Sequence, residues 1–274
     1  VMSATPIPRT LALIAYGDLD VSVIGELPPG RRPVETFLVS EALRERLNGF
    51  IRRQCSEGHQ VYVVCPAVEE SEDGVLRSAE AWAQTLQQSV FPDLRVGLLH
   101  GKMKSTEKDA ALAAFSAGET DILVATTVVE VGVDVPNATL MVIENAERFG
   151  LSQLHQLRGR VGRGSAQSYC VLVSGTKNEE TKKRLQALCK TTDGFKIAEQ
   201  DLALRGPGDF FGSRQHGLPL LKVASLRMDL ETLRDAQQAA AAVIQTADSL
   251  NAPALAPLKA RVEALFTRQE VSLN

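Results

Sequence analysis

Residues 95–125 read RVGLLHGKMKSTEKDAALAAFSAGETDILVA, and this stretch decides the fold class. The apolar runs at 95–99 and 121–125 have the length of buried strands, and residues 105–117 between them are long enough for a helix. Two strands joined through such a helix lie parallel in one sheet. The stretch therefore predicts a β-α-β unit of an α/β fold.

The same alternation continues on both sides of this unit. Further strands are predicted at 36–39, 61–66, 139–143 and 168–173, and further helices at 41–57, 79–90 and 151–161. The pattern predicts a three-layer α/β domain with a mainly parallel sheet over residues 33–175.

Changes of composition divide the rest of the chain. Residues 1–32 are rich in proline and turns and end in a GELPPGRRP connector, which is typical of the end of one domain followed by a linker. Residues 176–219 predict a helical hairpin and a glycine-rich loop, with helices at 177–190 and 195–204. Residues 220–274 predict C-terminal helices, at 226–250 and 256–266.

Composition and charge narrow the class of protein. Of the 274 residues, 44% are hydrophobic and 23% charged, and no apolar run is long enough to span a membrane, so we expect a globular, cytoplasmic protein without membrane contact. The net charge of −3 gives no general attraction for nucleic acid, but residues 151–215 hold 11 basic and 6 acidic side chains. A nucleic-acid surface, if present, is expected there. The four cysteines lack CxxC spacing and predict buried thiols, not a metal site.

The most informative motif is QLRGRVGR at residues 156–163. On a continuous helix Gln156, Arg160 and Arg163 would share one face, while apolar residues would anchor the other. A solvated basic face is the plain alternative. Two glycines inside a helix each cost about 1 kcal/mol relative to alanine, which favours a functional interpretation.

This segment resembles motif VI of the superfamily 2 helicases, Q-x-x-G-R-x-G-R. The resemblance implies a RecA-like fold and makes Arg160 and Arg163 arginine fingers that reach the γ-phosphate of ATP, with Gln156 as the motif glutamine. Further segments resemble other helicase motifs in the same order along the chain. They are Ser3-Ala4-Thr5 (SAT), His100-Gly101-Lys102-Met103 (HGxM) and Ala125-Thr126-Thr127 through Glu130 and Gly132 to Asp134-Val135-Pro136 (motif V).

From these matches we expect two groups of site residues. ATP binding or its coupling is assigned to Gly132, Asp134, Ser3 and Thr5, and DNA contact to Thr126, Thr127, His100 and Gly101. The resemblance also places Asp134 near the two arginines, where it would orient a guanidinium by bidentate pairing. Simpler interpretations stay open for three of them. A threonine after a strand can cap a helix, Asp134 can close a turn, and His100 can be a structural histidine.

Residues 201–219, DLALRGPGDFFGSRQHGLP, resemble the translocation motif of the RecG family of bacterial branch-migration helicases. The resemblance makes Arg205 and Gln215 candidates for linking ATP-driven movement to the grip on duplex DNA. Transcription-repair coupling factors share a related motif, but the GPGD and QHGLP forms are more similar to RecG.

The sequence contains no GxxxxGK[ST] phosphate loop; residues 97–103, GLLHGKM, lack its spacing. The chain therefore resembles the carboxy-terminal part of a RecG-type helicase, in which residues 1–32 end the first RecA-like motor domain and residues 33–175 form the second. Mg-ATP would be bound mainly by the missing first motor domain, and a missing amino-terminal wedge would grip branched DNA.

The implied function is an ATP-dependent double-stranded DNA translocase that remodels stalled replication forks and Holliday junctions in repair and recombination. A single-stranded DNA-binding protein is a further candidate partner. By itself the chain is expected to hydrolyse no ATP. The alternatives are a translocase of the coupling-factor type and a non-catalytic domain that binds DNA or protein.

Overall fold

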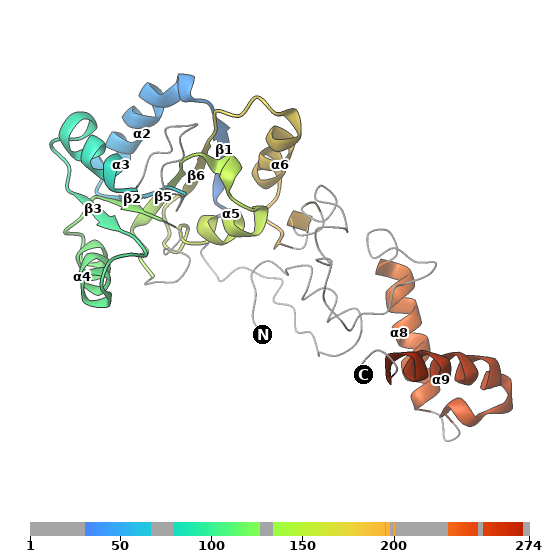
Figure 1. The fold of residues 1–274 in the computed structure, drawn as a ribbon. Coiled ribbons are helices and arrows are strands. Elements are labelled where there is room, and N and C mark those ends of the chain that lie inside the picture. The colour runs from blue at the N-terminus through green and yellow to red at the C-terminus, as the bar shows by residue number, and fades with distance from the viewer. Residues whose placement is uncertain are drawn as a thin grey trace. The chain divides into compact units, whose positions relative to one another are not determined.

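The computed structural model describes residues 31–66, 79–126, 134–194, 196–197, 200, 230–245 and 249–270. These residues belong to two compact units (Figure 1). The larger unit takes in the described residues from 31 to 200, and the smaller one those from 230 to 270. The predictions for residues 1–30 and 201–229 lie outside the described residues.

The larger unit is built on a six-stranded sheet in which every pair of neighbouring strands is parallel. The strands lie in the order β1-β6-β5-β2-β4-β3. Their bounds are β1 Glu35–Val39, β2 Gln60–Val64, β3 Val96–Leu99, β4 Ile122–Ala125, β5 Ala138–Ile143 and β6 Tyr169–Val173. All six strands lie within a residue or two of the predicted ones, and the mainly parallel sheet is confirmed.

Helices cover both faces of this sheet and complete the predicted three layers (Figure 1). The helices of one face are α2 (Arg44–Ser56) and α3 (Ala79–Thr85), which continues as the π-helical turn η2 (Leu86–Val90). The helices of the other face are α4 (Ser105–Ser116), α5 (Leu151–Arg158) and α6 (Glu179–Lys190). Side chains of the strands alternate between the two cores. In β2, for example, Tyr62 and Val64 pack under α4, whereas Val61 and Val63 pack under α2.

A buried ion pair fixes the start of α2 to the carboxyl end of β5. Both guanidinium Nη atoms of Arg44 donate to the carboxylate of Glu144, at 2.6 and 2.7 Å, and Arg44 also donates to Glu41 in the short helix η1 (Glu41–Leu43). Burial by itself would lower the pKa of Arg44, but the hydrogen bonds to Glu144 and Glu41 raise it above its ordinary value. The pair therefore stays ionised and orients α2.

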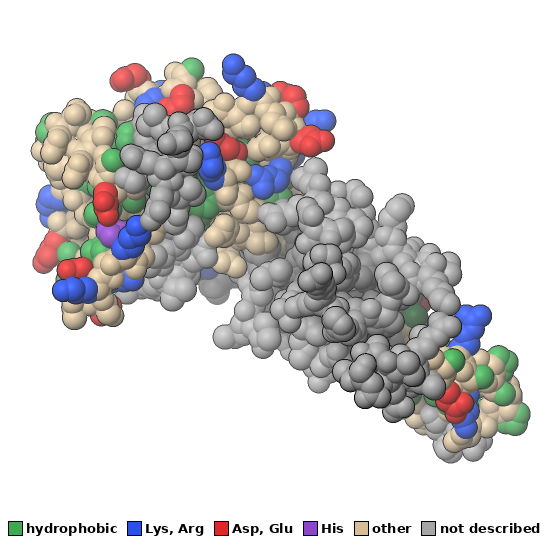
Figure 2. All heavy atoms as spheres, viewed as in Figure 1, with side chains coloured by type: hydrophobic (Ala, Val, Ile, Leu, Met, Phe, Trp, Pro, Cys, Tyr) green, Lys and Arg blue, Asp and Glu red, His purple; other side chains and the backbone are tan. Residues whose placement is uncertain are grey.

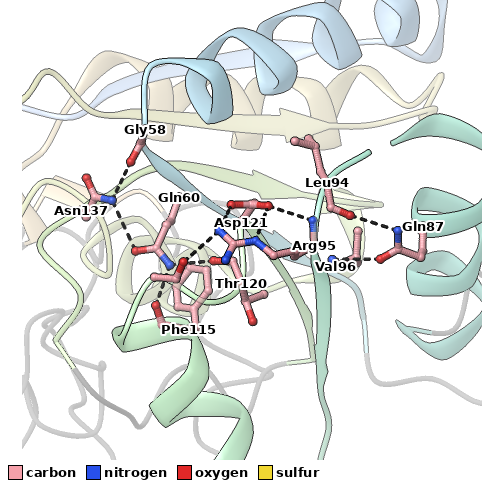
Figure 3. Close-up of polar contacts among 11 residues, drawn as sticks. Gly58, Gln60, Gln87, Leu94, Arg95, Val96, Phe115, Thr120, Asp121 and Asn137 are labelled. Carbon is pink, nitrogen blue, oxygen red and sulfur yellow. Dashed lines mark hydrogen bonds and ion pairs between the residues drawn. The ribbon is translucent and has the colours of Figure 1, made fainter. Parts of the chain in front are cut away.

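A second polar network ties together the amino ends of β2, β3 and β4 (Figure 3). The buried amide of Gln60 donates to the carbonyl oxygens of Phe115 and Thr120, which end α4 and precede β4. Arg95 and Asp121 form two side-chain hydrogen bonds of 3.0 and 2.6 Å. Asn137 donates to the carbonyl oxygen of Gly58 at 2.8 Å. The turn that precedes β5 is thus held against the amino end of β2.

The prediction of one helix over 151–161 is wrong at its carboxyl end. Helix α5 ends at Arg158, with Gly159 as its C-cap, and Gly162 has a φ of +77°. A left-handed residue cannot continue an α-helix, so the chain turns here. Arg160 and Arg163 therefore lie in a loop after the helix and do not share a helical face with Gln156.

Helix α6, the first helix of the predicted hairpin, is part of the same core as the sheet. Leu185 and Leu188 are fully buried in it, as is Ile197 beyond the helix. Arg158 is buried as well, and its Nη1 donates to the carbonyl oxygens of Leu188 and Thr191, at 2.8 and 2.9 Å. The end of α5 is thus joined directly to the end of α6.

The smaller unit consists of two longer helices and two short ones. Helices α8 (Leu230–Ile244) and α9 (Ala256–Glu270) lie where the sequence predicts C-terminal helices. The 3-10 turns η5 (Ser249–Asn251) and η6 (Pro253–Leu255) lie between them. Across the described parts of both units, no helix combines the length and apolar character that crossing a membrane requires.

Candidate functional site

The loop after α5 lies at the amino edge of the sheet, packed between the segments that precede β1 and β5. A Cβ atom on Gly162 would lie 2.7 Å from Val34 Cγ2, and one on Gly164 would lie 2.6 Å from the carbonyl oxygen of Pro136. Contacts this short exclude a side chain at either position. The two glycines therefore allow the loop to pack closely against the segments that precede β1 and β5. Arg163 lies between these two glycines in the chain.

Arg163 lies beside Asp134, as the resemblance implied. Its Nη1 is 3.3 Å from Asp134 Oδ1, and its Nε donates to the carbonyl oxygen of Gly159 at 3.2 Å. The contact with the carboxylate runs through one guanidinium nitrogen, whereas we had expected a bidentate pair. The side chains of Asp134 and Arg163 are 57% and 24% exposed, and a single ion-pair contact open to solvent contributes only about 1 kcal/mol or less. The guanidinium can therefore exchange this carboxylate for another anion.

The charged side chains at the amino edge of the sheet affect the pKa of Tyr62, whose phenol lies in the core. Burial raises the pKa of Tyr62 to about 12, the nearby guanidinium groups of Arg160 and Arg163 oppose the shift, and Asp134 adds to it. Arg160 is itself half-buried. All three charged side chains are thus near enough to affect the pKa of Tyr62, whose ring packs against Phe115 in the core.

Gln156 is the third residue of the motif that we singled out. It lies on α5, two residues before the helix ends, and is half-buried. Within the described part of the chain its side chain makes no hydrogen bond. Gln156 therefore has its amide available, but the structure does not put it on a common helical face with the two arginines.

Three of the predicted DNA-contacting residues, His100, Gly101 and Thr126, lie at the opposite edge of the sheet. His100 and Gly101 follow β3 and Thr126 follows β4, and the backbone N–H of Thr126 donates to the carbonyl oxygen of Leu99 at 3.1 Å. His100 Nε2 is 3.2 Å from Glu80 Oε1 in α3. Thr126 and the HGxM segment are therefore neighbours at the carboxyl ends of adjacent strands.

Internal bonds close the HGxM segment into a turn. The N–H of Met103 donates to the carbonyl oxygen of His100, whose own N–H points to the Met103 sulfur at 3.3 Å. Lys108 Nζ in α4 donates to the carbonyl oxygen of Gly101 at 2.7 Å. The turn thus brings Lys108 of α4 to the edge that was assigned to DNA, although no sequence motif singles this residue out.

Six predicted site residues lie outside the described residues: Ser3, Thr5, Thr127, Gly132, Arg205 and Gln215. The expected basic surface is described only in part. Figure 2 shows lysine and arginine side chains interspersed with acidic ones over α6, so this face carries charges of both signs there. Among the described residues no three His, Cys, Asp or Glu side chains gather as metal ligands do.

Comparison with known proteins agrees with the resemblance. Residues 41–165 match the helicase conserved C-terminal domain family, and residues 191–271 match the family described as ATP-dependent DNA helicase RecG, domain 3, C-terminal. The ATP-dependent DNA helicase RecG of Synechocystis is 56% identical over 87% of this chain, and that of Thermotoga maritima is 53% identical over the same share. The chain belongs to the RecG family.

The chain spans about a third of the length of its RecG relatives. It covers 29% of the Synechocystis protein, 30% of the Thermotoga maritima protein and 35% of RecG from Escherichia coli K12, to which it is 52% identical. A solved structure of RecG bound to a three-way DNA junction matches 85% of this chain and 30% of its own, with 51% identity and a TM-score of 0.66. The RecA-like fold is thereby confirmed.

Arg158 is the buried residue of the motif VI segment that sequence reasoning missed. The motif pattern Q-x-x-G-R-x-G-R leaves its position open, and a charged residue before a glycine is typical of a solvated helix end. Burial lowers the pKa of Arg158, because α6 closes over it. The buried position of Arg158 depends on its packing against α6, which begins about 20 residues further along the chain, so no local sequence pattern predicts it.

Proposed function

We propose that this chain is the second motor domain and coupling region of a RecG-type enzyme, an ATP-dependent double-stranded DNA translocase that remodels stalled replication forks and Holliday junctions in repair and recombination. The identity to RecG helicases supports the assignment to that enzyme class. The match of residues 191–271 to RecG domain 3 favours this function over that of a coupling factor.

The observation that carries the proposal is the weakly held guanidinium of Arg163 on the amino edge. In this role Arg163 leaves Asp134 and meets the γ-phosphate of ATP, with Arg160 beside it, and both stabilise the charge that develops on the transferred phosphoryl group. Between rounds of ATP hydrolysis, Asp134 orients the two arginines. Gln156, Gly132, Ser3 and Thr5 complete the contacts on the ATP side.

The residues present fit a phosphate group rather than a metal ion. Arg160 and Arg163 offer hydrogen-bond donors and positive charge, which suit anionic oxygens, whereas Mg²⁺ prefers carboxylate and carbonyl oxygens. We therefore assign Mg-ATP mainly to the first motor domain, which a longer parent chain would supply. When bound, ATP provides the phosphoryl transfer that drives movement, and this chain provides the arginines.

DNA contacts belong to the opposite edge in this proposal. Thr126, Thr127, His100 and Gly101 meet the nucleic-acid backbone, and Arg205 and Gln215 convert domain closure into movement along the duplex. Branched DNA held by an amino-terminal wedge is the substrate, and a single-stranded DNA-binding protein is a further partner. Such DNA lies in the cytoplasm of bacteria, where the proposal places the protein.

The test replaces Arg163 by alanine in the full-length parent protein. If Arg163 is an arginine finger, turnover of ATP falls about 10³-fold or more, with a milder loss of ATP binding. Arg163→Lys should restore little, because a lysine lacks the planar fork of the guanidinium. Arg52→Ala is the matched control, since Arg52 also forms an exposed ion pair, with Asp93, but lies outside the site. Near wild-type turnover of the Arg163→Ala protein would reject the proposal.

Two further measurements separate the alternatives. Fork regression by the full-length protein distinguishes a RecG-type enzyme from a coupling factor, which acts on stalled RNA polymerase. ATPase activity measured with and without the first motor domain addresses the non-catalytic alternative. We expect the 274-residue chain alone to show none, and robust magnesium-dependent turnover by the purified chain would contradict that expectation.

A further inference from the structure

An open apolar groove of about 570 Å³ lies between α2 and the edge strand β1. Its floor is formed by Phe37 and Val39 of β1 and by Tyr169 and Val171 of β6. Phe37 is 47% exposed, which is unusual for an aromatic residue in a sheet. The groove is on the face of α2 and α3, away from α6. Exposed apolar surface of this kind marks interaction sites.

The groove is open because β1 ends the sheet. The N–H of Glu35 and the carbonyl oxygen of Val39 bond to residues adjoining β6, so the main-chain groups of the intervening Thr36 and Leu38 point away from it, by the alternation of a strand. No strand of the described chain pairs with this outer edge. A further strand can therefore add to the sheet at β1.

The rim of the groove is positively charged. Arg46 and Arg53 of α2 line it, and no carboxylate is among its lining residues. The Arg53 guanidinium lies 5.0 Å from the centre of the Phe50 ring, and its ion pair with Glu57 is a long 3.9 Å contact between exposed side chains. Arg46 forms no ion pair within the described part of the chain. The rim thus offers two cations that an acidic ligand can engage.

We propose that this groove binds an extended, acidic segment of a separate protein, which adds to β1 as a strand. Alternate apolar side chains of the segment enter the groove, and flanking carboxylates meet Arg46 and Arg53. The apolar floor offers nothing to DNA phosphates. A second copy of this chain would bring the same two cations to the rim, and like charges disfavour that contact.

The experiment uses the full-length parent protein and a labelled probe peptide, Asp-Asp-Phe-Thr-Phe-Asp-Asp. Fluorescence anisotropy should show saturable binding, whereas the counterpart with four lysines should not bind. The double substitution Arg46→Glu with Arg53→Glu should weaken binding about tenfold, as two surface charges of modest strength allow. Lys190→Glu, on α6, is the control and should leave the affinity unchanged.

Hydrogen exchange tests the strand pairing separately. On binding, the peptide that contains Thr36 and Leu38 should gain protection, because their amides acquire partners. Phe37→Asp, which puts a carboxylate on the floor of the groove, should abolish binding while the melting temperature stays close to that of the unmodified protein.

Four results would overturn the proposal. Equal binding of the lysine peptide, or an affinity that the double charge reversal leaves unchanged, would exclude an acidic ligand at this rim. Binding to the 274-residue chain but not to the full-length protein would show that another part of the same polypeptide fills the groove. Absence of binding to both would show that the groove has no affinity for such a segment.

Discussion

At Gly162 the main chain adopts a left-handed conformation directly before the arginine that we propose as a finger. Its φ is +77°, and a Cβ atom would lie 2.7 Å from the Val34 side chain. Backbone conformation and packing therefore both demand glycine here. The residue prevents the chain from resuming a helix after α5 has ended at Arg158, and it turns Arg163 towards Asp134.

Gly162→Ala should lower the free energy of unfolding by about 2 kcal/mol, from the strained φ and the contact with Val34. Because Arg163 then shifts, ATP turnover of the full-length protein should fall as well. Gly49→Ala is the matched control, since nothing lies within 4 Å of its added Cβ and Gly49 is inside α2. It should raise stability by up to about 1 kcal/mol. Urea denaturation measures both, and a neutral Gly162→Ala would contradict the argument.

His155 should make stability depend on pH. Burial, with a contribution from the charge of Arg158, lowers the pKa of His155 from 6.5 to about 4. The unfolded chain therefore takes up a proton first as the pH falls, so stability is lost between about pH 6.5 and pH 4, by up to about 1 kcal/mol per pH unit. In urea denaturation from pH 7.5 to 4.5, His155→Gln should flatten this slope. An unchanged slope would contradict the prediction.

Among the elements, helix α6 shows most clearly which structural features depend on packing and cannot be predicted from the sequence. The strands could be predicted, because runs such as 61–66 and 140–143 are apolar throughout, as parallel strands buried on both faces are. The end of α5 could not, because a glycine within an amphipathic pattern can either continue a helix or end it. The packing of α6 against the core could not be predicted from the sequence either, because it depends on the contact between the buried Arg158 and the end of α6.

Some contacts of the candidate site could likewise be predicted from the sequence, and others could not. The position of Asp134 beside Arg163 followed from the motif resemblance, since the motif carries the spatial relation with it. The place of Lys108 next to Gly101 did not, because it depends on how α4 leaves β3. Contacts between residues of the family motifs can be predicted from the resemblance, whereas contacts of residues outside the motifs need the fold.

Arg158→Met should loosen the end of α6, because the carbonyl oxygens of Leu188 and Thr191 lose their charged donor. Methionine fills most of the volume, so the loss of stability should be about 2 kcal/mol, the range for hydrogen bonds to a charged group. Hydrogen exchange should show faster exchange at the end of α6. Lys182→Met, which removes an exposed ion pair with Glu179, should change stability by less than about 0.5 kcal/mol. Equal effects of the two substitutions would refute a special role for Arg158.

At the scale of the whole molecule, the parallel sheet separates two sets of candidate residues. Arg163 and Asp134 lie at its amino edge, and Thr126 and His100 at its carboxyl edge. In the proposed enzyme, ATP chemistry and DNA contact therefore take place at opposite edges of one sheet, and the glycine-rich loop with Arg205 and Gln215 follows in the chain.

Replacing Arg205 or Gln215 by alanine should uncouple ATP hydrolysis from fork unwinding in the full-length protein. DNA-stimulated ATPase should stay largely intact while fork unwinding collapses, since hydrolysis no longer does mechanical work on the duplex. Paired rates from one preparation are the measurement. Parallel loss of both activities would place the residues in the hydrolysis machinery, and loss of neither would remove them from the mechanism.

The separation of the two edges also limits how they can communicate. A strand of five residues is about 17 Å long, roughly twice the Debye length at physiological ionic strength. Salt therefore screens most of the effect that a DNA phosphate at one edge has on the partly exposed guanidinium of Arg163 at the other. In the proposed enzyme, bound DNA then stimulates hydrolysis by moving the sheet, and added salt should weaken DNA binding while leaving the stimulation by DNA already bound nearly constant.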